Sequence, residues 1–401
     1  MTAKKKSRGV DYFVLKHIVT AVFLCTLALA FVFGAQTKPP AVFADYGQWE
    51  ALSWAGSSGG ISPDGQWLAY GINRSDGNNE LRITKLADGT TKVVAFGTRP
   101  AFSSDSKWIA YSIGRSEADQ EKLRDEKKPV HNKLGLLNLA TGEMSTLDGI
   151  ESFVFSSDGA FLAMQRYRAE APSKPPGPPA GGGRGGSPSS EEMPGKTIIV
   201  RQLASGRDTP FGNVSQFVWQ TTENSHMLAM TISAEDKAGN GAHLFDPETS
   251  VLRVLDSSPS IYTGLVWRKD AADLAVYKAK TDEHKDGSTY VVLSWTGLGT
   301  DERLQTYDPT SDPTFPAGMR TVSFRPLLWS HDGTVLFLGI AEWEDKVVPE
   351  KEEGKGDEAS KAEKPSTVEV WHWTDVSVMP WQKIHAAEDR QRNMLAAWHL
   401  G

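Results

Sequence analysis

The chain has 401 residues, enough for two or three ordinary domains or for one large repeat architecture. Its net charge is −7 with 23% charged residues, so no basic field argues for a nucleic-acid partner. Its 37 Gly, 13 Trp and 16 Phe, together with few long helical patterns, favour β-structure.

Residues 1–44 form a targeting segment. A basic stretch, KKKSRG, precedes residues 18–35, which carry no charge. This layout predicts either a signal peptide, cleaved after Gly34 or Ala44, or an uncleaved N-terminal membrane anchor. In both cases the protein is exported, periplasmic or secreted, and touches the membrane only through this segment. The single cysteine, Cys25, lies inside it, so a cleaved protein has no disulfide and no thiol catalysis.

A turn followed by an apolar strand recurs along residues 46–401. SPDGQWLAYG contains Asp64, and related stretches place Asp105 and Asp158 at the same point of the turn, after 41 and then 53 further residues. Proline, aspartate and glycine favour β-turns, and the apolar runs on both sides predict a hairpin covered on both faces. A second hairpin signal follows each copy. One period therefore holds four strands, and a four-stranded propeller blade takes roughly 40–45 residues.

The sequence thus predicts an all-β protein, a β-propeller of four-stranded blades, apart from short pieces near residues 375–393. Six blades are recognisable, and a further one is expected to begin at the C-terminus, in NMLAAWHLG. This stretch resembles a third strand with no residues left for a fourth, so we expect Gly401 to be an artificial or mutational end. The blades are predicted to start near Ser58, Thr98, Ile150, Val214, Ser260 and Arg320. The aromatic side chains expected to be buried between blades are Trp67, Trp108, Phe161, Trp219, Trp267 and Trp329.

Three polar inserts, near residues 115–132, 171–195 and 347–366, each follow the second strand of a blade and precede the third. In a blade, this loop and the blade-to-blade connection share one end of the sheet, whereas the aspartate turns lie at the other end. The inserts are therefore expected to decorate a single face. Their Pro/Gly and Lys/Glu compositions predict disorder.

No motif predicts a catalytic, cofactor-binding or metal-binding residue. GSSGG around Ser58 matches the G-x-S-x-G nucleophile elbow, but a strand follows where the elbow needs a helix. GKT at residues 195–197 lacks the first glycine of a P-loop and also precedes a strand. The nine histidines include no H-E-x-x-H, and the turn aspartates lie a whole blade apart, which favours turns over calcium ligands. WHW at residues 371–373 is expected in the inter-blade core.

The turn-strand units resemble the exported propeller repeats of TolB-type proteins and, more closely, the N-terminal β-propeller of prolyl oligopeptidase family serine peptidases. Two stretches are similar to bacterial members of that family: YGQWEALSWAGSSGGISPDGQWLAYGI and VEVWHWTDVSVMPWQKIHAAEDRQRNMLAAWHL. The resemblance implies a propeller that caps a C-terminal α/β-hydrolase domain and restricts which peptides reach its Ser-Asp-His triad. No hydrolase domain follows in this sequence, so no triad residue carries over to it.

Two functions stay open. The first is the non-catalytic propeller portion of an exported serine peptidase, whose partner is a peptide or protein substrate that reaches the missing hydrolase domain. The second is a free-standing periplasmic propeller that binds a protein or envelope partner. Neither implies a cofactor or a nucleic acid. Translating the gene beyond Gly401 separates them, because a stop codon at an intact blade edge favours the second.

Overall fold

The structure, a computed structural model, describes residues 42, 49–53, 60–168, 194–223, 225–346, 374 and 376–400. The chain divides into two compact units, one comprising residues 1–50 and 74–77 and the other the remaining residues. In the first unit, the Arg74 guanidinium pairs with the Glu50 carboxylate at 2.7 Å. The second unit holds the sheets that form the propeller.

Several sequence predictions concern residues outside this description. They are the targeting segment with Cys25 and residues 18–35, the serine Ser58, residues 371–373, and most of the inserts at 171–195 and 347–366. Within the described ranges, no helix is both long and apolar enough to cross a bilayer.

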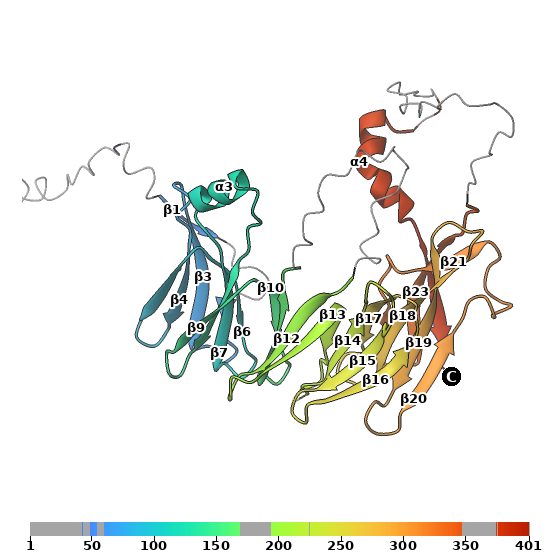
Figure 1. Ribbon diagram of the computed structural model, residues 1–401, viewed down its shortest axis with the longest axis horizontal. Helices are drawn as coiled ribbons and strands as arrows, with labels where there is room; N and C mark the ends of the chain where they lie inside the picture. Colours follow the sequence, from blue (N-terminus) through green and yellow to red (C-terminus); the bar gives the residue numbers. More distant parts are fainter. Residues whose placement is uncertain are drawn as a thin grey trace, which may run out of the picture. The chain divides into compact units, whose positions relative to one another are not determined.

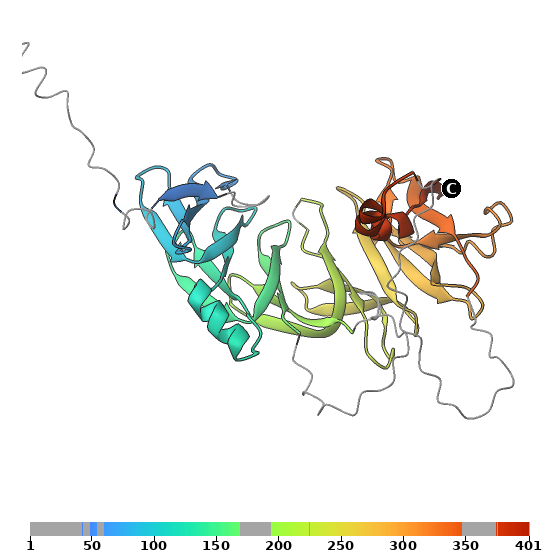
Figure 2. The same cartoon turned by 90° about the horizontal axis from the view of Figure 1, so that it is seen from above.

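The strands follow one another as antiparallel sheets, which are the blades of a β-propeller and are called blades 1 to 6 here (Figures 1 and 2). Blade 1 contains β1 (Glu50–Ser53), β2 (Gly60–Ile61), β3 (Trp67–Arg74), β4 (Glu80–Lys85) and β5 (Thr91–Ala95). Blade 2 contains β6 (Gly97–Phe102), β7 (Trp108–Ile113), β8 (Lys133–Asn138) and β9 (Met144–Asp148). Blade 3 contains β10 (Ile150–Phe155), β11 (Phe161–Arg166), β12 (Lys196–Gln202) and the first part of β13 (Asp208–Trp219).

Blade 4 contains the second part of β13, then β14 (Leu228–Ile232), β15 (Gly241–Asp246) and β16 (Val251–Ser257). Blade 5 contains β17 (Tyr262–Trp267), β18 (Leu274–Thr281), β19 (Ser288–Thr296) and β20 (Arg303–Tyr307). Blade 6 contains β21 (Met319–Val322), β22 (Leu328–Trp329), β23 (Val335–Glu342) and β24 (Met394–His399). In blades 1 and 6 the first strand is split into two short pieces that both pair with the second strand.

β13 serves two blades in succession. Residues 208–211 pair with β12, residues 216–219 pair with β14, and Val214 pairs with both. Between them Asn213 has a left-handed backbone (φ 57°), a conformation that asparagine tolerates better than most residues. One bent strand thus replaces a blade-to-blade loop, and blade 4 begins at Val214 as the sequence predicts.

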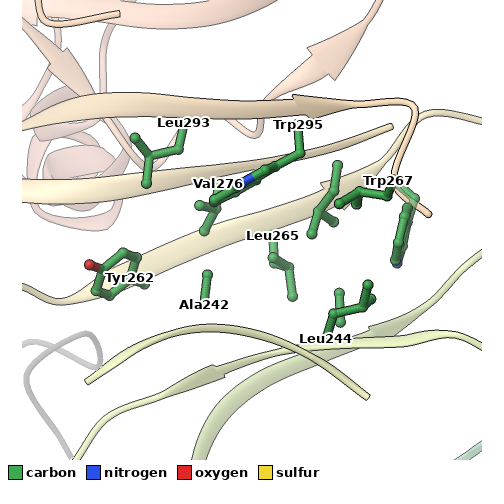
Figure 3. Close-up of a cluster of buried hydrophobic side chains, with 11 residues drawn as sticks. Ala242, Leu244, Tyr262, Leu265, Trp267, Val276, Leu293 and Trp295 are labelled. Carbon is green, nitrogen blue, oxygen red and sulfur yellow. The ribbon is translucent and has the colours of Figure 1, made fainter. Parts of the chain in front are cut away.

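The hydrophobic cores lie between successive blades. Each buried cluster combines residues of one blade with residues of the next. Figure 3 shows the cluster between blades 4 and 5, where Ala242 and Leu244 of β15 lie opposite Leu265 and Trp267 of β17. Because a blade is covered on both sides, its second strand contains four successive buried residues instead of alternating buried and exposed ones, as in β7, β11 and β18.

The six predicted aromatic positions belong to two classes. Three residues end a first strand and three begin a second strand: Trp219, Trp267 and Trp329 in the first class, and Trp67, Trp108 and Phe161 in the second. The prediction of burial is confirmed for Phe161 and for the whole first class. Trp67 and Trp108 are only half-buried.

The tryptophans that end first strands also connect neighbouring blades by hydrogen bonds. Each indole Nε1–H donates to a backbone carbonyl in the preceding blade, and that carbonyl belongs to the equivalent position of its own first strand. The bonds are Trp219 to Val154 (3.1 Å), Trp267 to Val218 (3.1 Å) and Trp329 to Val266 (3.4 Å). The repeated tryptophan of the sequence therefore makes the same hydrogen bond between successive blades.

Among the described residues, helices α3 and α4 lie outside the sheets (Figure 1). α3 (Glu117–Asp125) occupies the segment 115–132, where the sequence predicts disorder. Its residues are not buried, but Ser116 caps it by accepting the Asp119 N–H at 3.1 Å, and acidic residues lie in the first turn. This local chemistry stabilises a helix in a segment whose composition is typical of disorder. α4 (Met379–Arg390) lies where short non-β pieces are predicted.

The last strand, β24, corrects the expectation of a further blade begun at the C-terminus. It pairs antiparallel with β23, from Met394 opposite Ile340 to His399 opposite Val335. It is therefore the third strand of blade 6, as the likeness of NMLAAWHLG to a third strand suggests. Trp398 of this strand stacks on Tyr307 of blade 5 at 5.5 Å.

Candidate functional site

Each blade has two ends. At the turn end, tight turns join the first strand to the second and the third to the fourth. At the loop end, the second strand ends, the third begins, and one blade connects to the next. The turn aspartates serve their own turns. A serine two residues earlier donates its hydroxyl hydrogen to the aspartate and accepts the N–H that starts the next strand, in the pairs Ser62–Asp64, Ser103–Asp105, Ser156–Asp158 and Ser330–Asp332. The Ser330 hydroxyl and the backbone N–H of Thr334 lower the pKa of Asp332 to about 2. Within the described residues, no group of His, Cys, Asp or Glu could hold a metal ion.

A pocket of roughly 570 Å³ opens at the loop end of blade 3. Three cationic side chains line it: Arg166 and Arg168 at the end of β11, and Lys196 at the start of β12. Gly149 and Gly212, at the connections before and after blade 3, complete its edges. We call this site the basic pocket.

A close approach of two backbone segments shapes one side of the basic pocket. A Cβ atom on Gly195 would lie 2.1 Å from the carbonyl carbon and oxygen of Asn213, so only glycine fits there. Ser233 holds both segments: its carbonyl accepts the Gly195 N–H at 2.8 Å and its N–H donates to the Asn213 carbonyl at 2.7 Å. The β12–β13 register then shifts between Lys196 and Ile198. GKT is thus a bulged strand start, and not a P-loop, but all three of its residues line the pocket.

An aromatic pair forms another wall. The rings of His131, from blade 2, and Tyr167 stack with their centroids 4.2 Å apart and their planes at 13°. The Tyr167 hydroxyl accepts the Asn132 N–H at 3.2 Å, and the Tyr167 N–H donates to the Gly149 carbonyl at 3.2 Å. Since Tyr167 lies between Arg166 and Arg168 in the chain, these contacts fix the segment that carries both arginines.

The charges in the basic pocket are unequal. Lys196 Nζ pairs with Glu151 Oε2 at 2.5 Å, and Arg168 donates to the Pro194 carbonyl at 2.5 Å. The exposed Arg166 guanidinium has no ion pair or hydrogen bond with another described residue. Among the described residues, one carboxylate therefore faces three cations, so these side chains attract anions although the chain as a whole is acidic. A guanidinium presents N–H donors in a fork that matches a carboxylate or phosphate group.

Sequence reasoning did not find this pocket. Arg166 and Arg168 precede the insert at 171–195 and Lys196 follows it, so the pairing of β11 with β12 brings them together. The only sequence signal is the pair of basic stretches, RYR and GK, at the two ends of a Pro/Gly-rich segment.

No protein-family model matches the chain, and no curated protein matches it in sequence. Among solved structures, it is similar to the β-propeller domain of the Trilobed protease from Pyrococcus furiosus, with 12% identity and a TM-score of 0.36 over 74% of this chain and 79% of that one. TolB from Acinetobacter baumannii is 13% identical, with a TM-score of 0.28 over 64% of this chain and 54% of that one. Acylaminoacyl peptidase from Pyrococcus horikoshii is 11% identical, with a TM-score of 0.35 over 74% of this chain and 43% of that one. The present chain thus spans about half of that TolB chain and less than half of that peptidase chain.

Proposed function

We propose that this chain is the non-catalytic propeller portion of an exported prolyl oligopeptidase-like serine peptidase, and that its loop end holds peptide chains on their way to a hydrolase domain. The observation that carries the proposal is the basic pocket, with the Arg166 guanidinium, which pairs with no other described residue, at its edge. A peptide supplies the matching anion as a C-terminal carboxylate or as an Asp or Glu side chain.

The position of the basic pocket supports a role in admitting peptides. It lies at the loop end, where helices α3 and α4 also connect a second strand to a third. In repeat proteins, the face that carries the insertions is commonly the binding face. The free-standing alternative, a propeller that binds a protein or envelope partner, would use the same pocket; it differs in having no hydrolase domain to act on the bound chain.

Binding is tested by fluorescence anisotropy with the full chain and a labelled peptide of alternating Gly and Glu. Peptides with Gln or Lys in place of Glu serve as matched probes. We expect the Glu peptide to bind, the other two to bind much more weakly, and the affinity to fall as salt rises, because exposed charges are screened.

Charge reversal locates the site. Arg166→Glu should weaken binding of the Glu peptide about tenfold, since it replaces a guanidinium by a carboxylate that repels the peptide. Arg303→Glu is the control, because Arg303 is an exposed arginine at the turn end of blade 5. Equal binding by both variants, or no preference for the Glu peptide, would contradict the proposed binding role. DNA beyond Gly401 separates the two functions: a hydrolase domain with a G-x-S-x-G serine is expected for the peptidase, and its absence favours the free-standing propeller.

A further inference from the structure

A second pocket, of roughly 250 Å³, opens at the turn end between blades 4 and 5. Its apolar floor is formed by Leu244 of β15, Trp267 of β17 and Leu298 in the β19–β20 turn, each less than one-tenth exposed. Val251 of β16 also lines it, and this side chain is 56% exposed. Sites for whole small molecules usually measure roughly 300–1,000 Å³, so this volume suits a single large side chain. We call it the turn-end pocket.

One carboxylate, that of Asp246, lies at the edge of the turn-end pocket. Asp246 lines it and accepts hydrogen bonds from the Thr249 hydroxyl at 2.7 Å and the Glu248 N–H at 3.0 Å. Burial alone would raise the pKa of Asp246, but the hydrogen bonds from Thr249 and Glu248 outweigh it, and the pKa is lowered. Arg253, the cation among the lining residues, is neutralised by Glu302 at 2.7 Å.

His226 joins Asp246 to two further carboxylates. Its Nε2 lies 3.5 Å from Asp246 Oδ1 and 3.2 Å from Glu248 Oε2, and its Nδ1 lies 3.1 Å from Asp158 Oδ2 of blade 3. Three carboxylates share one imidazole, so the cluster keeps a negative charge whether or not the imidazole is protonated. The Glu248 side chain is 70% exposed and stands open to a ligand.

We propose that the turn-end pocket docks a segment of a partner protein that presents one large apolar side chain next to a lysine or arginine. The partner's apolar side chain inserts above Leu244, Trp267 and Leu298. Its transfer out of water favours binding. The neighbouring cation lies against Asp246 and Glu248, which the His226 imidazole does not fully neutralise. Charge complementarity thus selects the occupant, with the opposite sign to that of the basic pocket.

The probe is a fluorescein-labelled Gly/Ser dodecapeptide with a central Leu-Lys pair, added to the full chain at low ionic strength. Two matched peptides replace the leucine by alanine or the lysine by glutamate. We expect each replacement to raise the dissociation constant about tenfold, because the apolar contact and the ion pair contribute separately.

Two variants with equally exposed valines locate the binding. Val251→Arg places a cation at the mouth of the turn-end pocket, and Val93→Arg makes the same change on β5 of blade 1, where the valine is also 56% exposed. Val251→Arg should weaken binding of the Leu-Lys peptide about tenfold with an unchanged circular dichroism spectrum, whereas Val93→Arg should leave binding intact. Glu248→Gln should weaken it less. The proposal fails if the Leu-Lys peptide does not bind, if the alanine peptide binds equally well, or if both arginine variants bind alike.

Discussion

Replacing Trp267 by alanine tests whether the inter-blade cores hold the propeller together. Its side chain is 5% exposed within the cluster between blades 4 and 5 (Figure 3). Truncating a buried tryptophan to alanine costs about 3–5 kcal/mol, through lost apolar burial and the cavity left behind. Its indole N–H also donates to the Val218 carbonyl of blade 4, a bond that contributes about 0.5–1.5 kcal/mol.

The two contributions can be separated by Trp267→Phe. Phenylalanine keeps most of the apolar ring but has no donor for the Val218 carbonyl, so we expect a cost of about 1–2 kcal/mol. The measurement is urea unfolding followed by circular dichroism, with the change taken from the midpoint at an unchanged slope. Trp381→Ala is the control, because Trp381 on α4 is 54% exposed, and its loss should change the free energy of unfolding by less than about 0.5 kcal/mol. If Trp267→Ala costs no more than this control, packing between the blades does not stabilise the fold.

Four further outcomes are expected. Gly195→Ala should lower the unfolding midpoint and weaken binding of the Glu peptide, because its Cβ would meet the Asn213 backbone, whereas Gly212→Ala, with no atom within 4 Å of the added Cβ, should do neither. The lowered pKa of Asp332 contributes stability that is present above its ordinary pKa of 3.8 and is lost as pH falls towards about 2, so Asp332→Asn should unfold with a flatter pH dependence over that range. Ser116→Ala removes the cap of α3 and should cost that helix about 1 kcal/mol, seen as faster hydrogen exchange in the helix with an unchanged global midpoint. The purified chain should not react with a serine-directed fluorophosphonate; stoichiometric labelling abolished by Ser58→Ala would contradict this.

The strand order could be predicted from the sequence because the turns are determined locally. Around Asp158, a serine, an aspartate and a glycine within four residues build the tight turn from their own hydrogen bonds. The continuous apolar runs beside these turns then indicate strands that are buried on both faces of the sheet. The same local reasoning placed the start of blade 4 at Val214 and identified NMLAAWHLG as a third strand.

Two kinds of feature could not be predicted from local sequence. One is a helix whose composition is typical of disorder, and the other is a pocket formed by residues far apart in the chain. Helix α3 has the charged composition of a disordered segment, and only the Ser116 cap and the acidic first turn indicate a helix. The basic pocket depends on the pairing of β11 with β12 across an insert, and no periodicity relates Arg166 to Lys196. The turn-end pocket likewise depends on how blades 4 and 5 pack, which brings Leu244 to Leu298.

The most direct test of the central claim, that the loop end of blade 3 holds an anionic peptide chain, is hydrogen–deuterium exchange of the full chain with and without a saturating Glu peptide. Bound peptide should slow exchange at residues 166–168, 195–197 and 212–213, with no change at the turn end around residues 246–251. Protection confined to the turn end, or none at the loop end of blade 3 under saturating peptide, would contradict the account.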